Sequence, residues 1–156
     1  MKQLTYGQLS PDLQQAVKTA RDCSTRQYPK NSENHGVGAI LVSGDKTFCG
    51  AGIKRRRFNS STCAERHAID SALISGVSRI DRIVLYAQND KYPFEKVVSP
   101  CGSCRQIIYE AMVNLGQTDI ELVLANQDLS RIIITSISEL LPLVYSASTR
   151  QETSAA

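Results

Sequence analysis

Two short cysteine motifs constrain the fold of this chain more than any other feature of its sequence. They are Cys63-Ala64-Glu65-Arg66 and Pro100-Cys101-Gly102-Ser103-Cys104. Three cysteines in this pattern can supply three ligands of a tetrahedral Zn²⁺, and a site with three protein ligands keeps its fourth position open for water. An open position indicates a catalytic site. The chain must therefore fold so that two segments far apart in the sequence meet at one metal ion.

Glu65 stands two residues after the first cysteine, where its carboxylate can reach that water without being a metal ligand. A carboxylate in this place is typical of a general acid and base. A structural zinc site needs a fourth protein ligand and no carboxylate beside the metal. Glu65 therefore favours an enzyme over a non-catalytic, zinc-stabilised oligomeric module, which is the alternative from a different class.

Helical and strand patterns alternate along the chain. Ser10 and Pro11 are typical of a helix start, and each cysteine motif opens a helix that ends at a glycine, Gly76 or Gly116. We expect one helix that begins at residue 10, two helices over 63–75 and 101–115, and a last helical turn over 138–141. We expect strands over 36–42, 47–53, 80–87, 120–125 and 132–135. This alternation predicts an α/β fold, a three-layer α/β/α sandwich with a mixed central sheet.

Length and composition indicate one cytoplasmic domain. The chain has 156 residues, of which 42% are apolar, and we expect a single domain over 1–145 and a disordered polar tail over 146–156. The first residues lack an apolar signal core, and no apolar run is long enough to span a membrane. Five cysteines, an odd number, suit a reducing compartment without disulfides. Cys23 and Cys49 are interpreted as small buried apolar residues, in preference to a second redox or metal site.

The two motifs resemble those of the cytidine deaminase superfamily, in the branch that contains cytidine deaminase and blasticidin-S deaminase. Three-cysteine members carry C-A-E-R and S-P-C-G-x-C-R-Q, which are matched here at 63–66 and 99–106. The resemblance covers roughly residues 10 to 145 and implies the same sandwich fold. It also implies Zn²⁺ on Cys63, Cys101 and Cys104, with Glu65 moving protons in a hydrolytic deamination that releases ammonia.

The resemblance implies roles for three residues beside the ligands. Arg66 would hydrogen-bond the ligand sulfurs and offset their negative charge, and the alternative is an ordinary arginine on a helix surface. The backbone N–H of Ala64 and the carbonyl of Ser99 would orient the base of the substrate. Arg105 also follows a ligand cysteine, and a surface or interface ion pair is an equally open interpretation for it.

The segment before the first motif departs from the family at the positions that hold the sugar. Ordinary cytidine deaminases carry an N-x-E stretch there, and counting back from Cys63 places Gly52 and Lys54 at its Asn and Glu. The blasticidin-S deaminase pattern, G-V-N with an aromatic residue near Phe58, also puts Lys54 where Asn is expected. His35 falls where the family has a phenylalanine that packs on the pyrimidine; the alternative is a surface residue at a strand end.

Four consecutive cations, Lys54 to Arg57, form the second departure. In one interpretation they belong to a solvated strand end or to a subunit interface. In the other, one or two of them contact an anionic group of the substrate, and Lys54 and Arg56 are the candidates for that contact. The second interpretation argues against blasticidin S and unmodified cytidine as substrates. A nucleic-acid substrate is disfavoured, because the net charge is only +3 and aromatic residues are 6% of the chain.

The sequence thus predicts a zinc-dependent aminohydrolase that acts on a cytosine-type nucleoside, nucleotide or related small molecule. The alternative within the same class is deamination of an aminated purine or another free heterocycle. We also expect a homotetramer, because relatives of this size are tetramers and because Ile107, Ile108 and Met112 would leave apolar surface for a partner to cover.

Overall fold

The computed structural model describes residues 1–30, 35–91 and 93–146, and the side chains of His35 and Phe58 lie outside this described part. Within it, one sheet has the strand order β1-β6-β5-β4-β2-β3. Strands β4 and β5 are parallel, and the other neighbours are antiparallel, so the sheet is mixed as predicted. The strands are β1 (Lys2–Leu4), β2 (His35–Ser43), β3 (Lys46–Ala51), β4 (Arg82–Asn89), β5 (Glu121–Ala125) and β6 (Ile132–Ser136).

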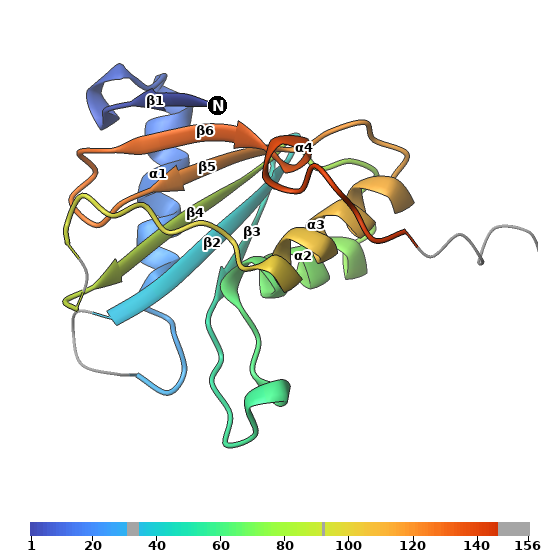
Figure 1. Ribbon diagram of the computed structural model, residues 1–156, viewed down its shortest axis with the longest axis horizontal. Coiled ribbons are helices and arrows are strands. Elements are labelled where there is room, and N and C mark those ends of the chain that lie inside the picture. The colour runs from blue at the N-terminus through green and yellow to red at the C-terminus, as the bar shows by residue number, and fades with distance from the viewer. Residues whose placement is uncertain (31–34, 92, 147–156) are drawn as a thin grey trace, which may run out of the picture.

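Helices cover both faces of the sheet, which confirms the predicted three-layer sandwich (Figure 1). Helix α1 (Pro11–Ser24) packs on one face, where its buried residues share a core with Ile40, Val84 and Val123. Helices α2 (Ala64–Ile74) and α3 (Gly102–Asn114) lie side by side on the other face. The short helix α4 (Ile137–Leu140) and two 3-10 turns, η1 (Tyr6–Gln8) and η2 (Phe58–Ser60), complete the described elements.

The helix boundaries follow from their capping residues. The Ser10 hydroxyl accepts a hydrogen bond from the Leu13 N–H at 3.4 Å, and Pro11 occupies the first turn of α1. Beyond the ends of α2 and α3, Gly76 and Gly116 have φ values of 74° and 66°. This left-handed conformation ends a helix at low cost only in glycine, so the predicted ends of both motif helices are confirmed.

The strands differ from the prediction at several ends; for example, β3 ends at Ala51, not at Ile53, and β4 ends at Asn89, not at Ala87. Strand β4 begins at Arg82, not at Ile80, because the Ile80 backbone pairs with the Gln117 side chain through bonds of 2.7 and 2.8 Å. Strand β1 was not predicted, since three residues are too short to show an alternating pattern; it pairs with the edge strand β6. Across the described residues, no helix combines the length and apolar character that a bilayer span requires.

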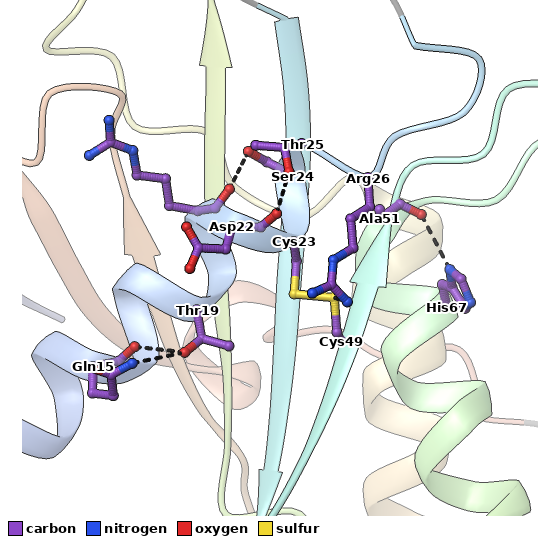
Figure 2. The surroundings of a disulfide bond; sticks show 11 residues. Gln15, Thr19, Asp22, Cys23, Ser24, Thr25, Arg26, Cys49, Ala51 and His67 are labelled. Carbon is purple, nitrogen blue, oxygen red and sulfur yellow. Dashed lines mark hydrogen bonds between the residues drawn. A yellow bond between two sulfur atoms is a disulfide. The ribbon is translucent and has the colours of Figure 1, made fainter.

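Two sequence interpretations of apolar residues are wrong. Cys23 and Cys49 are joined by a disulfide, because the last turn of α1 lies against the edge strand β3 with the two Cα atoms 6.0 Å apart (Figure 2). Ile108 and Met112 are buried in the chain's own core and Ile107 packs against that core, so these residues are not left for a partner. Both errors concern contacts between elements, which spacing along one element does not reveal.

Helix α2 approaches β3 closely because Gly50 has no side chain. A Cβ at Gly50 would collide with the carbonyl oxygen of Ala64 and lie 2.7 Å from the nitrogen of Ala68. The start of α2, which carries the first cysteine motif, is therefore held against the sheet by backbone contact.

We expect Gly50→Ala to lower the free energy of unfolding by about 1–3 kcal/mol, because α2 must move outward. Urea denaturation measures the change. The matched control is Gly7→Ala, since a Cβ at Gly7 meets nothing within 4 Å. Equal urea midpoints for wild type and both variants would show that the close packing at Gly50 is unimportant.

Candidate active site

Three cysteine sulfurs converge where α2 and α3 begin. Cys63 directly precedes α2, Cys101 directly precedes α3, and Cys104 lies in the first turn of α3. Their sulfur atoms all lie within 4.8 Å of one another. Cys104 is buried, whereas Cys63 and Cys101 are exposed, so the cluster is accessible from one side. The structure thus brings together the three residues that the sequence predicted as metal ligands.

The cluster fits a zinc ion. Zinc–sulfur bonds of about 2.3 Å in tetrahedral geometry place ligand sulfurs roughly 3.8 Å apart, a spacing within reach of this cluster. Among the His, Cys, Asp and Glu side chains of the described residues, none joins the three cysteines as a fourth donor. A set of three thiol donors with one open direction is the arrangement of a catalytic zinc site and not of a closed structural one.

The surroundings of Cys63 favour its thiolate. Hydrogen bonding from the Cys104 thiol lowers the pKa of Cys63 to about 6, against the opposing effect of burial, and Cys101 and the charge of Arg66 lower it further. The pKa of Cys104 is raised, because its proton is held by Cys63 and because the thiol is buried. Both helix N-termini also stabilise negative charge. Cys63 therefore ionises before Cys104.

Glu65 is buried beside the cluster in the first turn of α2, with 4% of its surface exposed. Burial raises the pKa of Glu65 to about 7; hydrogen bonds from its own backbone N–H and from Cys104 oppose the rise, and the Cys63 charge adds to it. A carboxyl group with such a pKa exchanges its proton readily near neutral pH. The position next to the sulfurs agrees with the sequence interpretation of Glu65 as an acid and base, not a ligand.

Arg66 is half-exposed and pairs with Asp70 one helical turn away, with 3.7 Å between Arg66 Nε and Asp70 Oδ2. Its charge nevertheless lies near enough to lower the pKa of Cys63. Both interpretations of Arg66 from the sequence thus have a counterpart in the structure: a surface ion pair, and an electrostatic effect on a cysteine of the cluster.

Arg105 holds the segment that leads into the second motif, a role that the sequence did not single out. Its Nε donates to the Pro100 carbonyl, its Nη1 to the Leu140 carbonyl in α4 and its Nη2 to the Ser99 hydroxyl, each at 2.9 Å. Three bonds from one planar guanidinium fix the backbone directly before Cys101 relative to α3 and α4. The signal available in the sequence was only that an arginine follows Cys104.

The predicted substrate-binding residues lie on three segments. Ala64 is buried at the first position of α2, and Ser99 lies next to Cys101 with its hydroxyl bonded to Arg105. His35 begins β2 and Phe58 begins η2, but their side chains lie outside the described part of the chain.

The four cations lie on the loop over residues 52–63, which projects from the sheet between β3 and α2 (Figure 1). Arg55 is bonded within this loop, to the Ser60 carbonyl at 2.6 Å and the Thr62 hydroxyl at 3.3 Å. The backbone N–H of Lys54 donates to the Tyr28 carbonyl at 2.7 Å. All four side chains of the run are exposed, and the bonds of Arg55 stabilise the loop itself.

We expect Arg105→Lys to release zinc to a chelator about tenfold more readily than wild type, because lysine cannot bond three acceptors on two segments. Chelator competition measures this affinity. The control is Arg131→Lys, which alters an arginine that bonds Gln3 far from the cysteines. Unchanged zinc affinity in Arg105→Lys would contradict the assignment.

Comparison with known proteins agrees with the site. The family model "Cytidine and deoxycytidylate deaminase zinc-binding region" matches residues 10–115 of the 156. A cytidine deaminase of Sporosarcina psychrophila is 29% identical over 86% of this chain and 92% of its own length. A blasticidin-S deaminase of Bacillus cereus is 30% identical over 90% of this chain and 96% of its own length.

Solved structures give the same relationship. The crystal structure of a cytidine deaminase from Burkholderia pseudomallei superposes with a TM-score of 0.70 and 28% identity, covering 88% of this chain and all of that one. A cytidine deaminase from Mycobacterium tuberculosis, at 18% identity and a TM-score of 0.64, shares the fold. The matched region contains both cysteine motifs, Glu65 and the two helices that carry them. The chain therefore belongs to the zinc-binding cytidine and deoxycytidylate deaminase family and is a deaminase of the hydrolase class.

Proposed function

We propose that this chain is a zinc-dependent hydrolytic deaminase of a cytosine-type nucleoside, nucleotide or related derivative, and that it releases ammonia. The observation that carries the proposal is the juxtaposition of three cysteine sulfurs, within 4.8 Å of one another, with a buried carboxyl group at the same helix start. The absence of a fourth donor among the described residues argues against a structural zinc module. The relatives named cytidine deaminase and blasticidin-S deaminase support the choice of a cytosine-type base.

Each residue of the cluster has a distinct part in this proposal. Cys63, Cys101 and Cys104 would hold Zn²⁺, which supplies Lewis-acid activation of water when bound. Glu65 would take one proton from water and deliver it to the ring nitrogen as the water oxygen bonds to the ring carbon that carries the amine. It would then move the remaining proton of that oxygen to the amine, which leaves as ammonia when the C–N bond breaks. Burial shields the carboxyl group from bulk solvent, so the proton remains in the site between these steps.

Neighbouring groups would orient the substrate and balance the charge. The Ala64 N–H and the Ser99 carbonyl lie directly next to Cys63 and near Cys101, respectively, where they can bond the polar edge of the base. The charge of Arg66 offsets part of the negative charge of three thiolates. His35 and Phe58 remain predicted substrate contacts.

The exposed cations suggest an anionic substrate. Lys54 and Arg56, whose side chains are exposed, are the predicted candidates for a contact with phosphate or carboxylate, and Arg55 is bonded within its own loop. Such a charge-assisted contact contributes roughly 1.5–3 kcal/mol to binding. A nucleotide would then be preferred over its nucleoside.

We also propose a cytoplasmic homotetramer. Ile74 at the end of α2 is 88% exposed and Val113 in α3 is 44% exposed, so apolar surface remains on the outer sides of the two motif helices. The cytoplasm is proposed because a reducing compartment would keep the three cluster cysteines available for zinc. The Cys23–Cys49 disulfide argues in the other direction, since such a compartment disfavours disulfides.

Glu65→Gln should retain zinc and the fold but lose about 10²–10⁴-fold in turnover, because the amide cannot carry the proton. Cys101→Ala should instead lose zinc and unfold at lower temperature. Elemental analysis, thermal melting and ammonia release measure these effects, with Glu110→Gln, an exposed carboxylate of α3, as the control. Wild type that contains no zinc, or full turnover by Glu65→Gln, would remove the basis of the proposal.

The substrate class is tested by ammonia release from cytosine, cytidine, deoxycytidine, CMP, dCMP, blasticidin S and aminated purines. Arg56→Ala and Lys54→Ala should each lower kcat/KM for the nucleotide about tenfold or more and leave the nucleoside almost unchanged. Lys18→Ala is the charge-matched control, since Lys18 is exposed on α1 across the sheet. Equal kcat/KM for nucleotide and nucleoside in wild type, at low and high salt, would show that the run has no part in substrate binding.

A further inference from the structure

Gln27 has a buried side-chain amide whose donor has no partner in the part of the chain that the structure describes. The residue follows the C-terminal end of α1 and is 5% exposed. Its Nε2 atom is buried and has no hydrogen-bond partner among the described residues. Buried polar groups in native proteins are almost always paired, so an unpaired donor of this kind points to a partner that the free chain lacks, such as a ligand or an ordered water.

The segment that carries Gln27 is bonded to the beginning of the 52–63 loop. The Tyr28 N–H donates to the Gly52 carbonyl at 3.0 Å, and the Lys54 N–H donates to the Tyr28 carbonyl at 2.7 Å. Tyr28 and Ile53 form a parallel bridge, which places Gln27 beside Gly52. A Cβ at Gly52 would lie 3.5 Å from Gln27 Oε1 and 3.8 Å from its Cγ. The Gln27 side chain thus covers the position from which a side chain at residue 52 would project.

This position lies between two residues that contact the first motif helix or the residue before Cys63. On one side of Gly52, the Ala51 carbonyl is 3.4 Å from His67 Nδ1 in α2 (Figure 2). On the other side, Ile53 exchanges two backbone hydrogen bonds of 2.8 Å with Thr62, the residue directly before Cys63. The residues that flank Gly52 therefore both contact the segment that forms the start of α2, where Cys63 and Glu65 lie.

We propose that Gln27 is a specificity-determining residue whose Nε2 donates a hydrogen bond to an uncharged oxygen, a hydroxyl, on the group attached to the base. Gly52 stands where the asparagine of the N-x-E stretch is expected, so an amide from the end of α1 takes the place of the amide missing from the loop. This proposal rests on the deaminase function proposed above. It names a residue of this chain that binds the part of the substrate attached to the base.

A buried donor kept for a ligand weakens the unliganded fold, which separates this role from a structural one. Gln27→Met keeps the volume and removes the donor. Without ligand it should melt at the same or a higher temperature than wild type, whereas loss of a structural hydrogen bond would lower the melting temperature.

The test compares cytidine with 2′,3′-dideoxycytidine, which lacks two hydroxyl groups. Wild type should prefer cytidine, and Gln27→Met should lower kcat/KM for cytidine about five- to tenfold, mainly through KM, with little change for the dideoxynucleoside. Titration calorimetry of cytidine into the zinc-loaded Glu65→Gln protein, with and without Gln27→Met, should give the same ratio without turnover. The double variant Gln27→Ala/Gly52→Asn, which moves the amide onto the loop, should recover the preference.

The outcomes separate the two proposals. Wild type that deaminates cytosine compounds, together with a Gln27→Met variant of unchanged preference, overturns the role of Gln27 and leaves the deaminase function intact; the amide then holds only a water. A lower melting temperature of Gln27→Met with unchanged preference assigns the amide to the fold and overturns the role as well. Wild type that neither binds nor deaminates any cytosine compound overturns both proposals.

Discussion

The site depends on two helices that both run antiparallel to β4. Helix α2 leads into β4 through a short connection, and α3 leads out of it to the parallel strand β5 as a crossover. Both helices therefore run in the same direction, and their starts lie side by side on one face of the sheet (Figure 1). Cysteines at these starts become neighbours, and the two helix N-termini stabilise their thiolates. The helix starts bring the cysteines together, although residues 52–63 and 90–101 connect these starts to β3 and β4.

Close backbone packing makes this arrangement rigid. Helix α2 rests on Gly50, and Arg105 fixes the backbone before Cys101 through three hydrogen bonds. Against this support the fold tolerates two polar groups that a protein selected only for stability would avoid. Glu65 is buried with a raised pKa, and the Gln27 donor has no partner among the described residues. Functional sites are where a chain departs from the local rules of stability, and both departures lie around the start of α2.

The sequence predicted the features that depend on local chemistry, and it did not predict the features that depend on tertiary contacts. Helix ends at Gly76 and Gly116, the cap at Ser10 and the meeting of the cysteine motifs were predictable, because each depends on residues within one segment or on motif spacing. The Cys23–Cys49 disulfide was not, because it depends on how α1 crosses the edge strand. The same holds for Arg105 and Gln27, since an arginine after a cysteine and a lone glutamine after a helix carry no signal until their partners are placed.

Chemistry and recognition are therefore built on different supports. The proton-transfer groups lie on helix starts that the sheet positions, and they are tied to the topology. The groups proposed to bind the substrate beyond its base lie on residues 52–57 and on Gln27. Backbone hydrogen bonds of Tyr28 with Gly52 and with Lys54 join these two segments. Because the two segments are adjacent, an amide lost from one can be replaced from the other without moving the metal ligands. If these residues bind the substrate as proposed, a change of substrate in this fold requires substitutions at residues 52–57 or at Gln27 and none in the cysteine motifs.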